Sequence, residues 1–462
     1  MTADQDRPAW MPARQRVFTE GQVAEMRAAL DEFRSPGAYE PGRWMVSEFN
    51  RDPAVVGSEF PASVSLRDIT LRTVEQLGIS LTLDQRLEII GALAQAGVSE
   101  IVTSAFRRGH TLAEMKREAD FAHSVNAATR LCYGGANTPD DIKMAADAGY
   151  DSVQVWIGPF LGQAVPAVAG AVYHRAWTGR DWHDLNFPQR PEDQFAKLGA
   201  LGEAAAERGI QVSIILALIT YARQPYIEEF AKAALHSGAS DVTFGDHASA
   251  LSPEGWAYLS RVAAAVAPGL RLGVHSHDMF GLATACALAG ARGGASVLEV
   301  SVNGLTEGPA QADLAETACA LEALYGVPTG IALDQLTAVS HTVADITGEP
   351  VRPLQPLVGT EVFDVGATGD EYAQEFKIDE LFHFAVTPST VGNARHLAVS
   401  ATTGPYTVWD KLDELGIEAT HDQVAEIHAR CKAEAARRQA QLPDSVVAEI
   451  ASAVIGQDSP EG

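Results

Sequence analysis

The stretch LRLGVHSHD, residues 270–278, decides how this chain is interpreted. It is an apolar run that ends in His275 and His277, two positions apart. Residues i and i+2 of a β-strand point to the same face, so both imidazoles point the same way at a strand end. Two neutral imidazoles form half of a divalent metal site. An isolated H-x-H is also compatible with two histidines that only pack, and the rest of the chain distinguishes these interpretations.

Similar apolar runs recur along the chain and alternate with segments of helical period. They lie at residues 64–71, 100–105, 129–133, 152–157, 211–217, 241–245, 270–275 and 296–302. Eight such runs with helices between them predict an α/β fold, a (β/α)₈ TIM barrel. An open doubly wound sheet is the alternative, but no glycine-rich dinucleotide fingerprint follows the first run.

The length of 462 residues exceeds the ~250 residues of a typical barrel. We expect an N-terminal extension over residues 1–60, the TIM barrel over 61–327 and a C-terminal, mostly helical subdomain over 328–462. We expect this subdomain to serve as an arm in a homodimer. The connection at 159–188 follows the fourth run and is either a lid or an irregular surface insertion.

Composition excludes several partners. The net charge of −26 disfavours nucleic acid and anionic membranes, and no apolar run reaches the ~20 residues that span a bilayer. The first residues lack the architecture of a secretory signal. The four cysteines are widely separated and form no C-x-x-C pair, which is typical of free thiols in a reducing compartment. These observations predict a cytoplasmic protein.

Polar residues follow three of the predicted strands. In a (β/α)₈ barrel, chemistry collects where strands end. The first run leads into residues 68–76, the seventh into 275–278 and the eighth into 302–308. Because strands one, seven and eight are neighbours in a closed barrel, Arg72, both histidines and Asn303 can converge on one point. This convergence favours a site over two packed histidines.

These segments resemble the homocitrate synthase, isopropylmalate synthase and Re-type citrate synthase group, whose superfamily includes HMG-CoA lyase. The group's motifs are D-x-T-L-R-[D/E]-G-x-Q, H-x-H-[N/D]-x-x-G-x-A and N-G-x-G-E-R-x-G-N. The matching residues are Asp68, Thr70, Leu71, Arg72 and Gln76 with Glu75 beside them, then His275, His277, Asp278, Gly281 and Ala283, then Asn303, Gly304 and Glu307. Further similarity extends to about residue 416, and this C-terminal part favours a synthase over a lyase.

The resemblance implies a Claisen-type condensation of acetyl-CoA with a 2-oxo acid. A divalent metal (Mg²⁺, Mn²⁺ or Zn²⁺) would polarise the keto group. By position, His275 and His277 are metal ligands and Asn303 is the candidate third. Arg72 would stabilise developing oxyanion charge, and Glu75 would orient Arg72 or a bound water.

Three departures from the motifs affect the implied site. Thr73 stands where the family has an acidic metal ligand, so a hard oxygen donor is lost. Three interpretations follow. The metal is held by the two histidines, Asn303 and the substrate; or Asp68 contributes an oxygen ligand; or the metal site is degraded and the protein has another function. In the third motif, Gly308 and the Ala310-Gln311 pair replace the family's Arg and Gly-Asn.

The family's S-G-I-H segment aligns with residues 367–370, so Asp370 becomes the candidate general base. A solvated loop aspartate is the alternative for this residue.

Polar and cationic side chains near the expected strand ends favour a polar or dianionic 2-oxo acid, such as oxaloacetate, 2-oxoglutarate or a phosphonopyruvate-like acid. The candidate substrate-binding residues are Gln76, Thr73, Arg107, Tyr133 and Arg223. In the alternative interpretation, Arg107 and Arg108 do not bind the 2-oxo acid but face water or bind a phosphate of CoA. Two other functions stay open: a metal-dependent lyase or aldolase, and a divergent, metal-poor paralogue without catalysis.

Overall fold

The computed structural model describes residues 19–57, 60–103, 111–136, 138–157, 191–367 and 369–457. The connection at 159–188 and Arg107 and Arg108 lie outside the described residues. Contacts divide the chain into two compact units. One is Phe49–Val351, and the other combines Met1–Glu48 with Arg352–Gly462.

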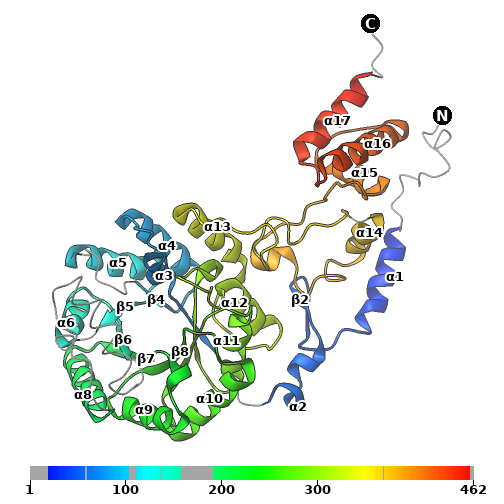
Figure 1. The fold of residues 1–462 in the computed structure, drawn as a ribbon. Coiled ribbons are helices and arrows are strands. Elements are labelled where there is room, and N and C mark those ends of the chain that lie inside the picture. Colours follow the sequence, from blue (N-terminus) through cyan, green and yellow to red (C-terminus); the bar gives the residue numbers. More distant parts are fainter. Residues whose placement is uncertain are drawn as a thin grey trace. The chain divides into compact units, whose positions relative to one another are not determined.

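The larger unit contains a closed barrel of parallel strands (Figure 1). The strands are β3 (Ser65–Asp68), β4 (Glu100–Val102), β5 (Arg130–Ala136), β6 (Ser152–Ile157), β7 (Gln211–Leu216), β8 (Asp241–Asp246), β9 (Arg271–Ser276) and β10 (Val297–Val300). The order β10-β3-β4-β5-β6-β7-β8-β9 closes the sheet, and β10 pairs with both β3 and β9. The structure thus confirms the predicted (β/α)₈ barrel.

Helices follow the strands and surround the barrel in Figure 1. They are α4 (Leu83–Gln95), α5 (Leu112–Val125), α6 (Pro139–Asp147), α8 (Pro191–Arg208), α9 (Gln224–His236), α10 (Pro253–Val266), α11 (Ala283–Arg292) and α12 (Leu314–Ala323). Their sequences explain their bounds. In α4, for example, Thr82 and Gln85 form a capping box, and Ile89, Ile90 and Leu93 are buried on one face.

The first predicted run, residues 64–71, is only partly a strand. β3 ends at Asp68, and the short helix α3 (Thr70–Gln76) begins two residues later. The Asp68 carboxylate accepts hydrogen bonds from the Thr70 backbone N–H at 2.9 Å and from its hydroxyl at 2.8 Å. This local side-chain-to-backbone contact turns the chain out of the strand and into the helix.

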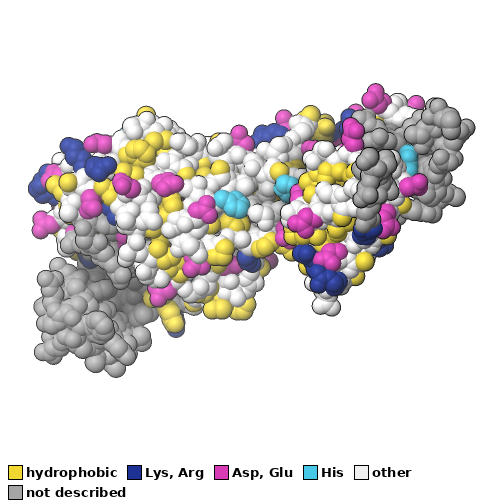
Figure 2. All heavy atoms as spheres, turned by 90° about the horizontal axis from the view of Figure 1, so that it is seen from above, with side chains coloured by type: hydrophobic (Ala, Val, Ile, Leu, Met, Phe, Trp, Pro, Cys, Tyr) yellow, Lys and Arg dark blue, Asp and Glu magenta, His cyan; other side chains and the backbone are white. Residues whose placement is uncertain are grey.

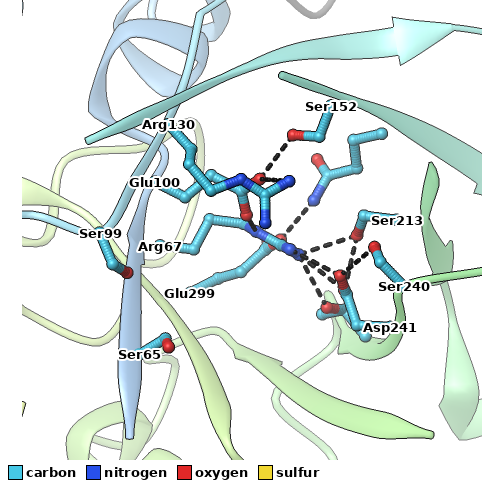
Figure 3. Close-up of polar contacts among 12 residues, drawn as sticks. Ser65, Arg67, Ser99, Glu100, Arg130, Ser152, Ser213, Ser240, Asp241 and Glu299 are labelled. Atoms are coloured by element: carbon cyan, nitrogen blue, oxygen red, sulfur yellow. Dashed lines mark hydrogen bonds and ion pairs between the residues drawn. The ribbon is translucent and has the colours of Figure 1, made fainter. Parts of the chain in front are cut away.

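An ion network fills part of the barrel interior (Figure 3). Arg67 on β3 is fully buried and contacts Asp241 at 2.9 Å and Glu100 at 2.5 Å. Its Nη1 also donates to Ser213 at 2.8 Å. Burial alone would lower the pKa of Arg67, but the charges of Asp241 and Glu100 raise it well above its ordinary value. The guanidinium therefore joins strands from opposite parts of the barrel.

Helix α13 (Leu336–Thr347) belongs to the barrel unit. Ser340 on α13 hydrogen-bonds Asn303, and the nearby Ala332 N–H donates to the Ala96 carbonyl. The structure therefore groups residues 328–351 with the barrel, whereas the sequence analysis groups them with the C-terminal helices.

The smaller unit brings the two ends of the chain together. Helix α1 (Glu20–Asp31) contacts α14 (Asp370–Ile378), and Arg34 pairs with Asp379. Three further helices, α15 (Pro405–Glu414), α16 (His421–Arg438) and α17 (Asp444–Gln457), share an apolar core. That core includes Val408, Leu412, Val424, Ile427, Cys431, Val447 and Ala451.

The surface carries many acidic side chains, as the net charge of −26 predicts, and the cysteines are free thiols, as their spacing predicts. Acidic side chains are spread over the visible faces in Figure 2, between hydrophobic and neutral ones. The four cysteines are all buried and unbridged. Among the described helices, none is both long and apolar enough to cross a membrane.

Candidate active site

Arg72 lies on α3, directly after β3, and is fully buried. Its Nη1 donates to Gln154 Oε1 at 2.7 Å, and its guanidinium carbon lies 4.6 Å from the centroid of the Trp156 ring. Its Nη2 lies 3.6 Å from Glu299 Oε2, beyond hydrogen-bond distance. Within the described part of the chain, Nη2 and Nε have no hydrogen-bond partner. Burial lowers the pKa of Arg72, which nevertheless remains a cation with unused donors.

His275 is the fifth residue of β9 and His277 follows the strand, as the sequence predicts. Their Nε2 atoms lie 3.2 Å apart. His275 Nδ1 lies 2.8 Å from Glu299 Oε2, and His277 Nδ1 lies 3.2 Å from the Pro309 carbonyl oxygen. Because carboxylate and carbonyl oxygens accept, both Nδ1 atoms carry the proton. Both Nε2 atoms therefore present lone pairs to the same point.

Glu299 on β10 fixes the His275 ring by accepting the hydrogen bond of its Nδ1 atom. Burial alone would raise the pKa of Glu299, but the hydrogen bond from His275 and the charges of Arg72, His275 and Arg67 lower it to about 2. Gln154 also donates to Glu299. The carboxylate stays ionised and fixes the orientation of the His275 ring.

His247, which the sequence analysis missed, completes an imidazole cluster. It directly follows β8, the strand beside β9. Its ring centroid lies 5.0 Å from that of His275 and 5.1 Å from that of His277. One nitrogen of each of the three rings lies within 4.8 Å of the others. Burial lowers the pKa of His247 to about 2, and the neighbouring His275 and His277 oppose a further proton on its ring. Its position at the end of the sixth predicted run is the sequence signal that could have identified it.

Gln311 also reaches the cluster. It pairs with His277 in an isolated β-bridge, and its Nε2 lies 3.4 Å from His275 Nε2 and 3.2 Å from His277 Nε2. Its Oε1 is buried and has no hydrogen-bond partner among the described residues. The amide therefore satisfies the two imidazole lone pairs with its N–H groups.

Asn303 is directed elsewhere by its hydrogen bonds. It adopts a left-handed backbone conformation, with φ of 58°, in the short helix η4 (Val302–Gly304). Its Nδ2 donates to the Ser340 carbonyl at 3.0 Å, and its Oδ1 accepts from the Ser340 hydroxyl. The structure thus brings Gln311 into hydrogen-bond contact with the imidazoles, whereas the Asn303 amide contacts Ser340.

The candidate residues on α3 are buried or half-buried near Arg72. Thr73 is fully buried, and its hydroxyl donates to the Thr70 carbonyl at 3.0 Å. Gln76 accepts from Thr306 at 3.4 Å, and Glu75 is half-buried. These contacts hold α3 against the end of the eighth strand.

The other candidates for substrate binding are spread out. Tyr133 is buried on β5 and packs edge-on against Tyr150, with ring centroids 6.2 Å apart. Arg223 is exposed at the start of α9, and Arg107 lies outside the described residues.

Asp370 lies in the smaller unit, where it caps a helix. Its carboxylate accepts from the Thr407 N–H at 2.8 Å, the Thr407 hydroxyl at 2.9 Å and the Tyr406 N–H at 3.3 Å. These groups belong to the first turn of α15, whose own N-cap is Gly404. A Cβ at residue 404 would overlap the Asp370 carboxylate, so the glycine makes this contact feasible. Both oxygens of Asp370 are thus engaged in capping, which disfavours its expected role as general base.

The donor set of the cluster fits a divalent transition metal. Two imidazole lone pairs point at one place, a third imidazole is adjacent, and an amide oxygen lies close by without a partner among the described residues. Imidazole nitrogen is a ligand that Zn²⁺ and related ions prefer.

Comparison with known proteins agrees with this architecture. The HMGL-like family model matches residues 181–343. A protein named (R)-citramalate synthase from Methanoculleus marisnigri is 31% identical over 377 residues, which cover 81% of this chain and 69% of the relative. A 2-phosphonomethylmalate synthase from Streptomyces rubellomurinus is 31% identical over 359 residues, which cover 76% of this chain and 88% of the relative.

The solved structures give the same fold. HMG-CoA lyase from Bacillus subtilis superposes with a TM-score of 0.52 at 15% identity, covering 65% of this chain and 98% of the lyase. At this identity the likeness concerns the barrel alone. Taken with the two synthases, these findings show that the chain belongs to the HMGL-like family of TIM-barrel synthases.

Proposed function

We propose that the barrel unit condenses acetyl-CoA with an anionic 2-oxo acid, giving a 2-hydroxy-2-alkyl diacid and CoA. The observation that carries this proposal is the position of Arg72. A fully buried cation, two of whose nitrogens have no hydrogen-bond partner among the described residues, lies at the same strand ends as the imidazole cluster. The Glu299 carboxylate lies 3.6 Å from Arg72 and accepts from His275, so hydrogen-bond donors of Arg72 remain for an anionic ligand. The family to which the chain belongs contains synthases whose names describe substituted malates.

Arg72 would bind the oxygen on which negative charge develops when the keto carbon is attacked. Its Nη1 is held by Gln154 and its plane is supported by Trp156, so the remaining donors are preorganised. A divalent cation bound at the imidazoles would act as a Lewis acid on the keto group. A base takes a proton from the methyl group of acetyl-CoA, the methyl carbon joins the keto carbon while the keto oxygen takes up a proton, and water then cleaves the thioester to a carboxylate and CoA thiol. Asp370 is not used in this scheme.

We propose a polar second group on the 2-oxo acid. Trp156 near the end of β6 lies beside Arg72, and its indole N–H has no hydrogen-bond partner among the described residues, so it offers a donor beside an apolar ring face. The similarity to a 2-phosphonomethylmalate synthase supports a substrate with a second anion.

Release of CoA thiol tests this function directly. The purified protein is incubated with acetyl-CoA, a divalent metal and one 2-oxo acid at a time. Oxaloacetate, 2-oxoglutarate and 3-phosphonopyruvate are compared with pyruvate and 3-methyl-2-oxobutanoate. We expect the first group to stimulate CoA release, and mass spectrometry to find the condensed 2-hydroxy acid, which carries one carboxymethyl group more than the 2-oxo acid. Absence of CoA release with every acid would refute the condensation.

Arg72→Lys sharpens the test. Lysine retains the charge but not the planar fork, and loss of one such donor to a developing oxyanion lowers kcat by about 10²–10³-fold. Arg261→Lys, at an exposed position on α10, is the matched control and should keep wild-type turnover. Cleavage of a 3-hydroxyacyl-CoA without any condensation would instead favour the lyase alternative.

A further inference from the structure

We infer that His247, His275 and His277 together form a nitrogen-rich metal site that takes Zn²⁺ or Co²⁺ in preference to Mg²⁺ or Mn²⁺. The resemblance to the synthases implies the H-x-H pair, with Asn303 as the candidate third ligand. The new element is His247, which supplies a third imidazole where the chain lacks the family's acidic ligand. The inference deepens the proposed function, because it names the metal class of the same site.

The protonation of the H-x-H pair is the first argument. The Nδ1 atoms of His275 and His277 donate to Glu299 and to the Pro309 carbonyl, so both Nε2 atoms are acceptors. Two acceptors 3.2 Å apart repel each other unless a cation or a donor lies between them. Adjacent ligands of a tetrahedral ion with metal–nitrogen bonds of 2.0–2.1 Å are separated by about 3.3 Å. The observed spacing matches that of two ligands of one metal ion, which would replace the Gln311 amide as the partner of both lone pairs.

The position of His247 is the second argument. Its Nδ1 is buried without a hydrogen-bond partner among the residues that the structure describes. The Trp156 ring lies 5.7 Å away, and the other close rings among the described residues are the two histidines. A buried ring nitrogen without a donor or acceptor is unfavourable, and binding to a metal would satisfy it.

Gln311 supplies a fourth group. Its buried amide oxygen has no partner among the described residues, while its Nε2 faces both imidazole Nε2 atoms. Rotation of the amide by half a turn exchanges these atoms and presents the oxygen to a metal. Oxygen and nitrogen of a glutamine amide are nearly the same size, so the exchange needs no added space.

Among the described residues, the group that could hold a metal consists of three imidazoles and no carboxylate, and this composition determines the metal class. Position 73 is a threonine whose hydroxyl donates to the Thr70 carbonyl. Glu299 lies on the far side of the His275 ring, bound to Nδ1, and so supports that ring instead of binding the metal. Mg²⁺ and Mn²⁺ prefer hard oxygen ligands, whereas three neutral imidazoles suit Zn²⁺ and Co²⁺.

The first test uses wild-type protein, so no variant needs to fold. The protein is stripped with a chelator and loaded with one equivalent of Zn²⁺, and X-ray absorption counts the coordinated imidazoles. We expect three imidazole nitrogens at about 2.0–2.1 Å. A shell of two imidazoles completed by oxygens would overturn the inference.

The second test compares metal affinities in variants. Zn²⁺ and Mn²⁺ are titrated against a chromophoric chelator with wild type, His247→Ala and His236→Ala, an exposed histidine on α9. We expect His247→Ala to weaken Zn²⁺ binding by more than about 100-fold, the upper range for losing a residue that only supports a ligand. Mn²⁺ binding should change little. Unchanged Zn²⁺ affinity in a folded His247→Ala protein would contradict the inference.

These measurements need neither acetyl-CoA nor a 2-oxo acid. A site with three imidazoles and no CoA release would uphold the inference and refute the condensation. CoA release by a protein whose Zn²⁺ has only two imidazole ligands would support the condensation and refute the inference.

Discussion

The Nδ1 atom of His275 donates to the Glu299 carboxylate at 2.8 Å. This contact determines which nitrogen of the imidazole faces the candidate metal site. Glu299 is also 3.5 Å from Arg67, the cation at the centre of the barrel's ion network. The Glu299 carboxylate therefore interacts both with the Arg67 cation in the barrel interior and with the His275 ring that we expect to bind the metal.

Glu299→Gln should weaken Zn²⁺ binding by about 10- to 100-fold, because the neutral amide makes the His275 ring a poorer ligand. Titration with a competing chelator measures this change. Glu118→Gln is the matched control, since Glu118 is equally buried but pairs with Arg86 and Tyr150. An equal loss of Zn²⁺ affinity in both variants would indicate general damage to the fold.

Thr73→Asp should tighten Mn²⁺ and Mg²⁺ binding by roughly 10-fold or more, because a carboxylate is the hard donor that the site lacks. Thr73→Asn has the same shape without the charge and serves as the control. Isothermal titration of both metals gives the affinities. Unchanged or weaker binding in Thr73→Asp would mean that this side chain does not face the site.

Asp370→Ala should lower the free energy of unfolding by about 0.5–2 kcal/mol, the usual cost of losing a helix N-cap. Asp370→Asn keeps an acceptor oxygen, and we expect it to retain most of the wild-type kcat. Loss of a general base would instead reduce kcat by about 10²–10⁴-fold. Denaturant unfolding and steady-state kinetics measure the two effects, with Glu418→Ala, in the exposed loop after α15, as the control.

Asp68 should make stability depend on pH. Burial raises its pKa to about 7, although its hydrogen bonds with Thr70 and the charge of Arg72 oppose the shift. Below about pH 4 the carboxyl is protonated in both states, and its contribution to stability is fully present. As the pH rises to about 7, the unfolded chain loses this proton first and the contribution disappears.

Asp68→Asn tests this sign. Relative to wild type, its free energy of unfolding should rise between about pH 5 and about pH 7, by up to about 3 kcal/mol at 1.36 kcal/mol per pH unit. Urea unfolding across this range gives the difference at each pH. A difference that stays constant with pH would show that Asp68 titrates alike in the folded and unfolded protein.

Arg67→Met should lower the free energy of unfolding by about 3–5 kcal/mol, because Asp241 and Glu100 would be left buried without their cation. Arg437→Met removes an exposed arginine that pairs with Glu434 in solvent and should change the free energy of unfolding far less. Denaturant titration compares the two. Similar losses would mean that the buried network contributes no more than a surface pair.

The barrel could be predicted from sequence because the signal is local. Each apolar run, such as residues 270–275, has the length and period of a strand whatever its partners are. The end of β3 was less predictable, since the run continues past Asp68 and only the contacts of its carboxylate with Thr70 stop the strand. The pairing of residues 19–48 with 352–457 was not expected, because it joins the two ends of the chain.

Part of the candidate site could be predicted from sequence, because some of its residues stand in local sequence motifs. Arg72, His275 and His277 stand in recognisable segments directly after predicted strands. His247 stands alone after its strand, so only the curvature of the closed sheet brings it to the other rings. The choice of Gln311 over Asn303 depends on the β-bridge to His277 and on Ser340 of α13, neither of which has a sequence signature.

The sequence by itself determined the alternation of strands and helices and the strand-end segments, because periodicity and turn chemistry act over a few neighbouring residues. Only the tertiary structure decided which side chains meet: the third imidazole, the amide beside it, and the cap that occupies Asp370. Those contacts join residues far apart in the chain, and their geometry follows from closure of the barrel and packing of the loops.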